Sequence, residues 1–143
     1  LLDEVLAKLR SLYLTMEILS GKNNQELLKH DTGRDAILPF LEKQGYFQNS
    51  KRKEAKEYKY GVIDGFPIDL TQIKVWKVPK NSSEIVLASD GYPILKKNLE
   101  STEKTLKMVL KKDPLLYKYH PSTKGLQKGN DSFDDRCYLR IAL

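Results

Sequence analysis

The spacing of apolar residues predicts a helical segment over residues 1–47, and its first helix covers residues 1–20. Apolar side chains recur there at intervals of three and four, as they do on one face of a helix. Gly21 is the expected end, because glycine readily takes the left-handed conformation that closes many helices. The predicted apolar face consists of Leu2, Val5, Leu6, Leu9, Leu12, Tyr13 and Met16.

Two shorter helices are predicted in the same segment. Asn24 is expected to cap one that runs to about His30, since an asparagine side chain accepts hydrogen bonds from free N–H groups. After an interruption at residues 31–33, another helix is expected to hold Pro39 in its first turn and to end at Gly45. Its predicted apolar face consists of Ile37, Leu38, Phe40 and Leu41.

After a polar loop over residues 48–56, apolar and polar residues alternate in the manner of strands. The pair Asp64-Gly65 is typical of a two-residue hairpin turn, so two of these strands are expected to form a hairpin. The predicted strands cover residues 58–62, 66–70 and 73–78.

The last third of the chain predicts a strand, a helix and a strand. An uninterrupted apolar run indicates a buried strand over residues 84–89. A helix is expected over residues 99–110, ended by Asp113-Pro114, because the residue before a proline avoids the helical conformation. A polar loop over residues 117–131 leads to a final strand over residues 137–143.

This order of elements indicates an α+β protein, with an antiparallel sheet packed with helices. The 143 residues suit a single domain or a fragment of a larger one. Its parts would be the helical segment, residues 1–47, and a strand-rich segment, residues 58–143. Leu1 opens a helical pattern with no capping residue before it, so we expect the chain to be a fragment, either a proteolytic product or the later part of a longer protein.

The cysteine count, the length of the apolar runs and the net charge limit which kinds of protein this chain can be. The single cysteine, Cys137, excludes an internal disulfide and a cysteine-based zinc cluster, and it fits a reducing, cytoplasmic location. No apolar run is long enough to span a bilayer, so no membrane partner is expected. The net charge of +6 draws attention to the basic residues 51–59, but Glu54 and Glu57 dilute them. No nucleic-acid-binding motif accompanies them, so we do not expect a nucleic-acid partner.

Two aspartate motifs carry the candidate chemistry. Ser89-Asp90-Gly91 ends the predicted strand 84–89, and Asp134-Asp135 leads into the final strand. Two strands that present carboxylates at one rim would supply the oxygen ligands that Mg²⁺ and Mn²⁺ prefer. Neighbouring residues on a strand point to opposite sides, so one of the pair can face the site. A plain turn is the alternative interpretation of Asp90 and Gly91.

Ser89-Asp90-Gly91 resembles the Ser-Asp-Gly motif of the PP2C-like (PPM-type) metal-dependent protein phosphatases. Residues 132–135, Ser-Phe-Asp-Asp, resemble the acidic motif that precedes the last strand of that family. The order of the motifs and the helix between them also agree, over about residues 58–143. The resemblance is to the C-terminal portion of a divergent, bacterial-type member, and it implies the C-terminal half of the PP2C α/β sandwich.

The resemblance implies specific roles. In that family both aspartates ligate a two-metal Mn²⁺ or Mg²⁺ centre, so Asp90 and Asp134 are the expected metal ligands. Gly91 would let the backbone pass close to the metal. Asp135 and Arg136 would support the ligands, with Arg136 pairing to Asp135 or contacting phosphate. The substrate would be a phosphoprotein, hydrolysed at phosphoserine or phosphothreonine.

The family's metal-bridging Asp-Gly motif and its phosphate-binding arginine have no counterpart in this sequence. The upstream half of the same protein is therefore an expected partner, and the isolated chain is expected to be inactive. Two alternatives stay open: a non-catalytic regulatory or binding module of the same scaffold, and a basic interaction domain that uses residues 51–59. Open strands are also expected to pair with another chain, a second copy included.

Overall fold

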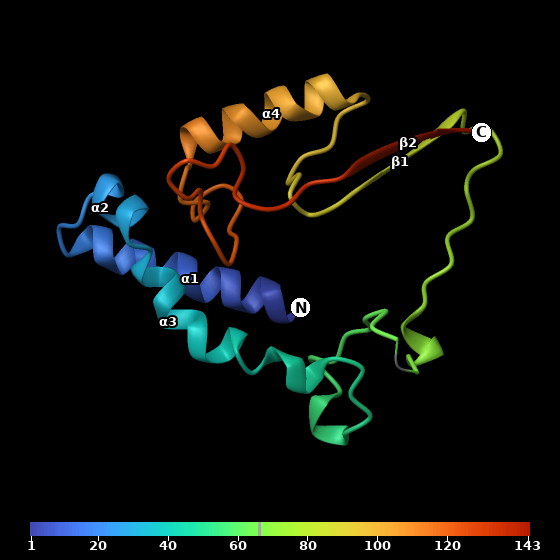
Figure 1. Ribbon diagram of the computed structural model, residues 1–143, viewed down its shortest axis with the longest axis horizontal. Coiled ribbons are helices and arrows are strands. Elements are labelled where there is room, and N and C mark those ends of the chain that lie inside the picture. The colour runs from blue at the N-terminus through green and yellow to red at the C-terminus, as the bar shows by residue number, and fades with distance from the viewer. Residues whose placement is uncertain (66) are drawn as a thin grey trace.

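The computed structural model describes residues 1–65 and 67–143 (Figure 1). Within these residues four α-helices accompany a two-stranded antiparallel sheet, so the predicted α+β class is confirmed. The helices are α1 (Leu2–Leu19), α2 (Asn24–Lys29), α3 (Thr32–Leu41) and α4 (Leu99–Lys112), the strands are β1 (Glu84–Ala88) and β2 (Tyr138–Ala142), and short 3₁₀ turns cover Gln44–Phe47, Lys53–Ala55 and Leu70–Gln72.

The three N-terminal helices form where they are predicted, but their boundaries differ. Asn23, not Asn24, caps α2, and it does so in a capping box with Glu26. The break between α2 and α3 lies at residues 30–31 rather than 31–33: the Asp31 side chain accepts a hydrogen bond from the Arg34 N–H at 2.8 Å and caps α3, which begins at Thr32. Pro39 consequently lies near the end of α3 rather than in its first turn.

The apolar face predicted for α1 is mostly wrong. Val5, Leu12 and Met16 are exposed, whereas α1 buries the face that carries Arg10 and Leu14. Gly33 of α3 explains this choice, because a Cβ there would lie 2.7 Å from a Leu14 carbon. Glycine thus lets α3 approach closely on the Arg10 side. No helix in the described part of the chain is both long and apolar enough to cross a membrane.

Arg10 connects the helical layer to the segment after α4. Its side chain is fully buried and forms an ion pair with Asp31, with Nη2 2.6 Å from Oδ2. The guanidinium also donates to the carbonyls of Leu115, at 2.8 Å, Leu116, at 3.3 Å, and Ser122, at 2.8 Å. A buried charge is tolerated only when it is paired and hydrogen-bonded, and Arg10 satisfies both conditions.

The segment that follows α4 joins two hydrophobic clusters. Leu115 packs with Leu14 of α1 and Leu27 of α2, while its neighbour Leu116 packs with Leu106 of α4. Leu116 has a positive φ of 48°, which is uncommon outside glycine. In Figure 1 this segment lies between α4 and the layer of α1 and α2. Leu115 and Leu116 pack in opposite directions, and together they hold α4 against the layer of α1 and α2.

The sheet consists of β1 and β2 in antiparallel register, with Leu87 opposite Leu139 and Ala88 opposite Tyr138. Tyr138 and Ala88 pack toward the cluster of α4, while Leu87 and Leu139 are exposed. The positions of the predicted strands 84–89 and 137–143 are therefore confirmed within one or two residues at each end. The expectation that the first of them is buried is wrong, because none of residues 84–88 is fully buried.

The other predicted strands are not confirmed. No strand forms in residues 58–65 or 67–78; Tyr60 makes only an isolated bridge to Gln48. The expected hairpin at Asp64-Gly65 is not formed in the described part either, because Asp64 accepts hydrogen bonds from Gln48 and Asn49 instead. Phe66, part of the predicted return strand, lies outside the described residues. Without a paired neighbour, an alternating sequence stays extended but gains no ladder of hydrogen bonds.

Candidate functional site

The two aspartate motifs lie side by side because the β1–β2 ladder continues past both strands. The Ser89 N–H donates to the Cys137 carbonyl at 3.1 Å, and the Cys137 N–H donates to Ser89 Oγ at 2.9 Å. Ser89 Oγ also donates to the Asp135 carbonyl at 3.3 Å. The serine hydroxyl thereby ties the end of β1 to the chain before β2. Asp90 and Asp134 are brought to the same end of the sheet.

Gly91 is required by close contact. A Cβ at this position would lie 2.4 Å from the Asp135 carbonyl oxygen, well inside any normal contact. Any larger residue would push the two motifs apart. The close approach that Gly91 allows is to the backbone of Asp135, and the expected approach to a metal stays a prediction.

Asp90 and Asp134 line the same cavity, of about 620 Å³, which we call the aspartate cleft. Asp90 is exposed, and the Asp134 side chain is 28% exposed. Asp135 is not among the cleft residues, but it lines a neighbouring cavity together with Asp134. The other charged or titratable residues that line the cleft are Asp3, Glu4, Arg34, Tyr119, His120 and Lys124.

Lys124 is a cleft residue that the sequence did not single out. Its Nζ lies 2.7 Å from Asp134 Oδ1, and the same oxygen accepts the Asp135 N–H at 2.9 Å. The loop position of Lys124 is set by its neighbour Gly125, where a Cβ would lie 3.0 Å from both Arg10 Nη2 and the Leu115 carbonyl. Only this tertiary contact brings Lys124 to the aspartate, so local sequence gave no signal for it.

The chemistry of the cleft suits a hard cation only in part. Two carboxylates fit the one or two that Mg²⁺ usually takes together with water and phosphate oxygens. Among residues 1–65 and 67–143, however, no group of three or more His, Cys, Asp or Glu side chains could hold a metal ion. Asp134 also has one oxygen already neutralised by Lys124. The cleft therefore offers a partial set of ligands.

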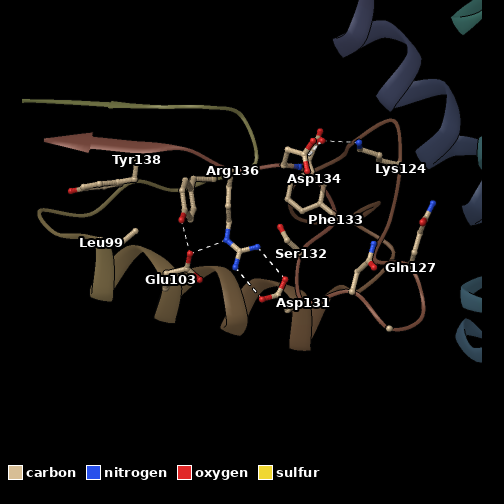
Figure 2. Close-up of a pocket in the computed structure, with 14 residues that line it drawn as sticks. Leu99, Glu103, Lys124, Gln127, Asp131, Ser132, Phe133, Asp134, Arg136 and Tyr138 are labelled. Carbon is tan, nitrogen blue, oxygen red and sulfur yellow. Dashed lines mark hydrogen bonds and ion pairs between the residues drawn. The ribbon is translucent and has the colours of Figure 1, made fainter.

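One expectation was that Arg136 pairs with Asp135, and the structure contradicts it. Its Nε donates to Glu103 of α4 at 2.8 Å, and its Nη2 lies 3.1 Å from Asp131 (Figure 2). Tyr92 donates its hydroxyl hydrogen to the same Glu103 oxygen at 2.5 Å. The Tyr92 hydrogen bond and then Arg136 hold the pKa of Glu103 below its usual value. Arg136 likewise lowers the pKa of Asp131.

This network lines a second cavity, of about 820 Å³, which we call the tyrosine cavity after Tyr92 and Tyr138 in its wall (Figure 2). Burial first, and then Glu103, raise the pKa of Tyr92, which keeps its phenol protonated and able to donate. Lys124, Phe133 and Asp134 line both cavities, so the two sites are neighbours.

No protein-family model matches the chain, and comparisons with curated proteins and with solved structures found no match either. The resemblance to PP2C-like phosphatases therefore rests on the two aspartate motifs alone.

Proposed function

We propose that this chain is part of a metal-dependent, PP2C-like serine/threonine phosphatase that hydrolyses phosphate monoesters, with Asp90 and Asp134 as metal ligands. The observation that supports this most is their common cleft, created by the β1–β2 ladder and by Gly91. The alternative interpretation, a plain turn at residues 89–91, would not require Gly91 to contact Asp135. Nor would it require Asp134 to line the same cavity as Asp90.

A bound Mn²⁺ or Mg²⁺ would supply Lewis-acid polarisation of the phosphoryl group and a water nucleophile at neutral pH. The chain's own residues would bind and orient. Asp90 and Asp134 provide oxygen ligands, and Lys124 provides a cation within reach of Asp134. With Asp134 serving as a metal ligand, the Lys124 ammonium would be available to an anionic phosphoryl oxygen, for which it is a suitable donor.

The ligand set is partial, so we assign the remaining metal ligands to the upstream half of the same protein. Mg²⁺ and Mn²⁺ centres that act on phosphoryl groups commonly use two ions, which need a bridging ligand. As part of the same proposal, the protein acts in the cytoplasm and its substrate is a phosphoprotein. The isolated chain is then expected to bind metal weakly and to be inactive.

A second candidate function is a non-catalytic binding module, and the Lys124–Asp134 ion pair favours it. A lysine that permanently neutralises Asp134 would compete with any divalent ion. In that case the cleft keeps its shape through internal pairing and requires no metal.

The test is hydrolysis of p-nitrophenyl phosphate with Mn²⁺ by the longest protein that contains this chain. Asp90→Asn and Asp134→Asn are each expected to lower the rate at least a hundredfold, since each removes a metal ligand. Glu100→Gln, which neutralises an exposed carboxylate of α4 outside the aspartate cleft, is the matched control and should retain most activity. Activity that survives both ligand variants would reject the phosphatase proposal, and the absence of any activity in the wild type would favour the non-catalytic module.

A further inference from the structure

The tyrosine cavity contains a buried hydroxyl without a partner. Ser132 is 7% exposed, and its Oγ has no hydrogen-bond partner among the described residues. Figure 2 shows its side chain directed into the space between Arg136 and Phe133. Buried polar groups are nearly always hydrogen-bonded, and leaving one unpaired costs roughly 1–3 kcal/mol. A ligand that fills the cavity would supply the missing partner.

The charges of the cavity select the class of ligand. Four carboxylates line it, those of Glu103, Asp131, Asp134 and Asp135, against the two cations Lys124 and Arg136. Both cations are already engaged: Lys124 with Asp134, and Arg136 with Glu103 and Asp131. The excess of carboxylates favours a positively charged ligand over an anion.

The aromatic wall points to the same class. Tyr92 and Tyr138 meet edge to face, with their ring centroids 6.3 Å apart, and both line the cavity. Aromatic faces attract guanidinium and ammonium groups, and the attraction grows when water is excluded. The amides of Gln127 and Asn130 add hydrogen-bond acceptors to the lining of the cavity. Ser132 Oγ would then accept a hydrogen bond from the bound cation.

We propose that the tyrosine cavity binds an organic cation, namely the guanidinium or ammonium group of a basic side chain in a peptide. This proposal does not depend on the phosphatase proposal, because the cavity needs no metal. The two connect through their shared wall of Lys124, Phe133 and Asp134. A peptide could place one residue in the aspartate cleft and a neighbouring basic residue in the tyrosine cavity.

The experiment is a metal-free NMR titration of the protein with N-acetyl-arginine amide and, separately, with N-acetyl-citrulline amide. Citrulline has the shape of arginine without its charge. The arginine probe is expected to bind at least fivefold more tightly and to shift the amide signals of Asn130, Asp131, Ser132 and Arg136. Equal affinity for the two probes, shifts confined to residues outside the cavity, or no binding at all would overturn the proposal.

Two variants test the hydroxyl itself. Ser132→Ala is expected to weaken arginine binding at least threefold while the thermal midpoint stays the same or rises, because an unpaired buried hydroxyl is removed. Ser83→Ala, which changes an exposed serine away from the cavity, should leave binding unchanged. Full arginine affinity in Ser132→Ala would show that the hydroxyl is not part of a cation site.

Discussion

Two stretches that were both predicted to be strands differ in this fold. Residues 84–88 become β1, paired with β2 and backed by α4. Residues 73–78 stay extended and unpaired, with Val75 89% and Trp76 81% exposed. In Figure 1 the chain that leads up to β1 is an extended loop that lies apart from the helices. A strand-like sequence suits a half-buried position in a sheet, but the segment joins a sheet only when a partner strand pairs with it.

Contacts distant in sequence explain the difference. The region around β1 is held by Ser89 against Cys137, and the segment after α4 is held by Arg10. Residues 73–78 have no comparable anchor in the described part of the chain. The comparison therefore predicts large effects for substitutions at the anchors and small ones in residues 73–78.

The largest effect is expected for Arg10→Met. It leaves Asp31 without its partner and the buried carbonyls of Leu115 and Leu116 without donors. Removing one partner of a buried ion pair costs about 3–5 kcal/mol of unfolding free energy. Urea unfolding followed by circular dichroism measures this loss. Lys74→Met is the control in the unpaired stretch and should change stability by less than about 0.5 kcal/mol; equal losses in the two variants would contradict the comparison.

The next effect concerns the contact between the two motifs. Gly91→Ala forces a Cβ against the Asp135 carbonyl and is expected to cost about 1–3 kcal/mol, the usual penalty of overpacking. Gly45→Ala meets no atom within 4 Å and serves as the matched control. Thermal unfolding of both variants measures the difference. If Gly91→Ala proved as stable as Gly45→Ala, the close approach of the motifs would be wrong.

A pH dependence is expected from the Tyr92–Glu103–Arg136 network. Hydrogen bonds from Tyr92 and Arg136 lower the pKa of Glu103 in the folded state. The unfolded chain therefore takes up a proton first as the pH falls, near the ordinary glutamate pKa of about 4.3. The contribution of Glu103 is complete above that pH and is lost as the pH falls through the lower, folded pKa. Urea midpoints between about pH 6 and 3 should fall less steeply in Glu103→Gln, and parallel curves would refute this assignment.

The smallest effect is expected for Trp76→Ala. The indole is 81% exposed and residues 73–78 have no strand partner, so its loss should change the unfolding free energy by less than about 0.5 kcal/mol. A loss above about 1.5 kcal/mol, measured by urea unfolding, would mean that another chain or segment covers Trp76 in solution.

The parts of the fold that depend on local sequence were predictable. Apolar spacing predicted the helices, and the apolar run before Ser89 predicted β1. The buried face of α1 was not predictable from apolar spacing, because α1 has apolar residues on several sides. Arg10 lies four residues after Leu6 and four before Leu14, both buried, and that spacing was the available signal.

The candidate site was predictable in one respect. Motif order placed Asp90 and Asp134 near each other, and the structure places both in one cleft. Two features of the site were missed, the ion pair of Lys124 with Asp134 and that of Glu103 with Arg136. The partners are 10 and 33 positions apart in the sequence, and the fold of the loop after α4 brings them together. Tertiary contacts of this kind are set by burial and charge pairing, which appear only in the folded chain.

The central claim is that Asp90 and Asp134 form one metal-binding cleft, and paramagnetic broadening by Mn²⁺ in NMR spectra tests it most directly. Titration of the protein should broaden the amide signals of Asp90, Asp134 and Lys124 together, at the same Mn²⁺ concentration. Asp90→Asn should remove the broadening at Asp134 as well, because the two carboxylates hold the same ion, whereas Glu100→Gln on the exposed side of α4 should not. Broadening at only one of the two aspartates, or at neither, would contradict the account.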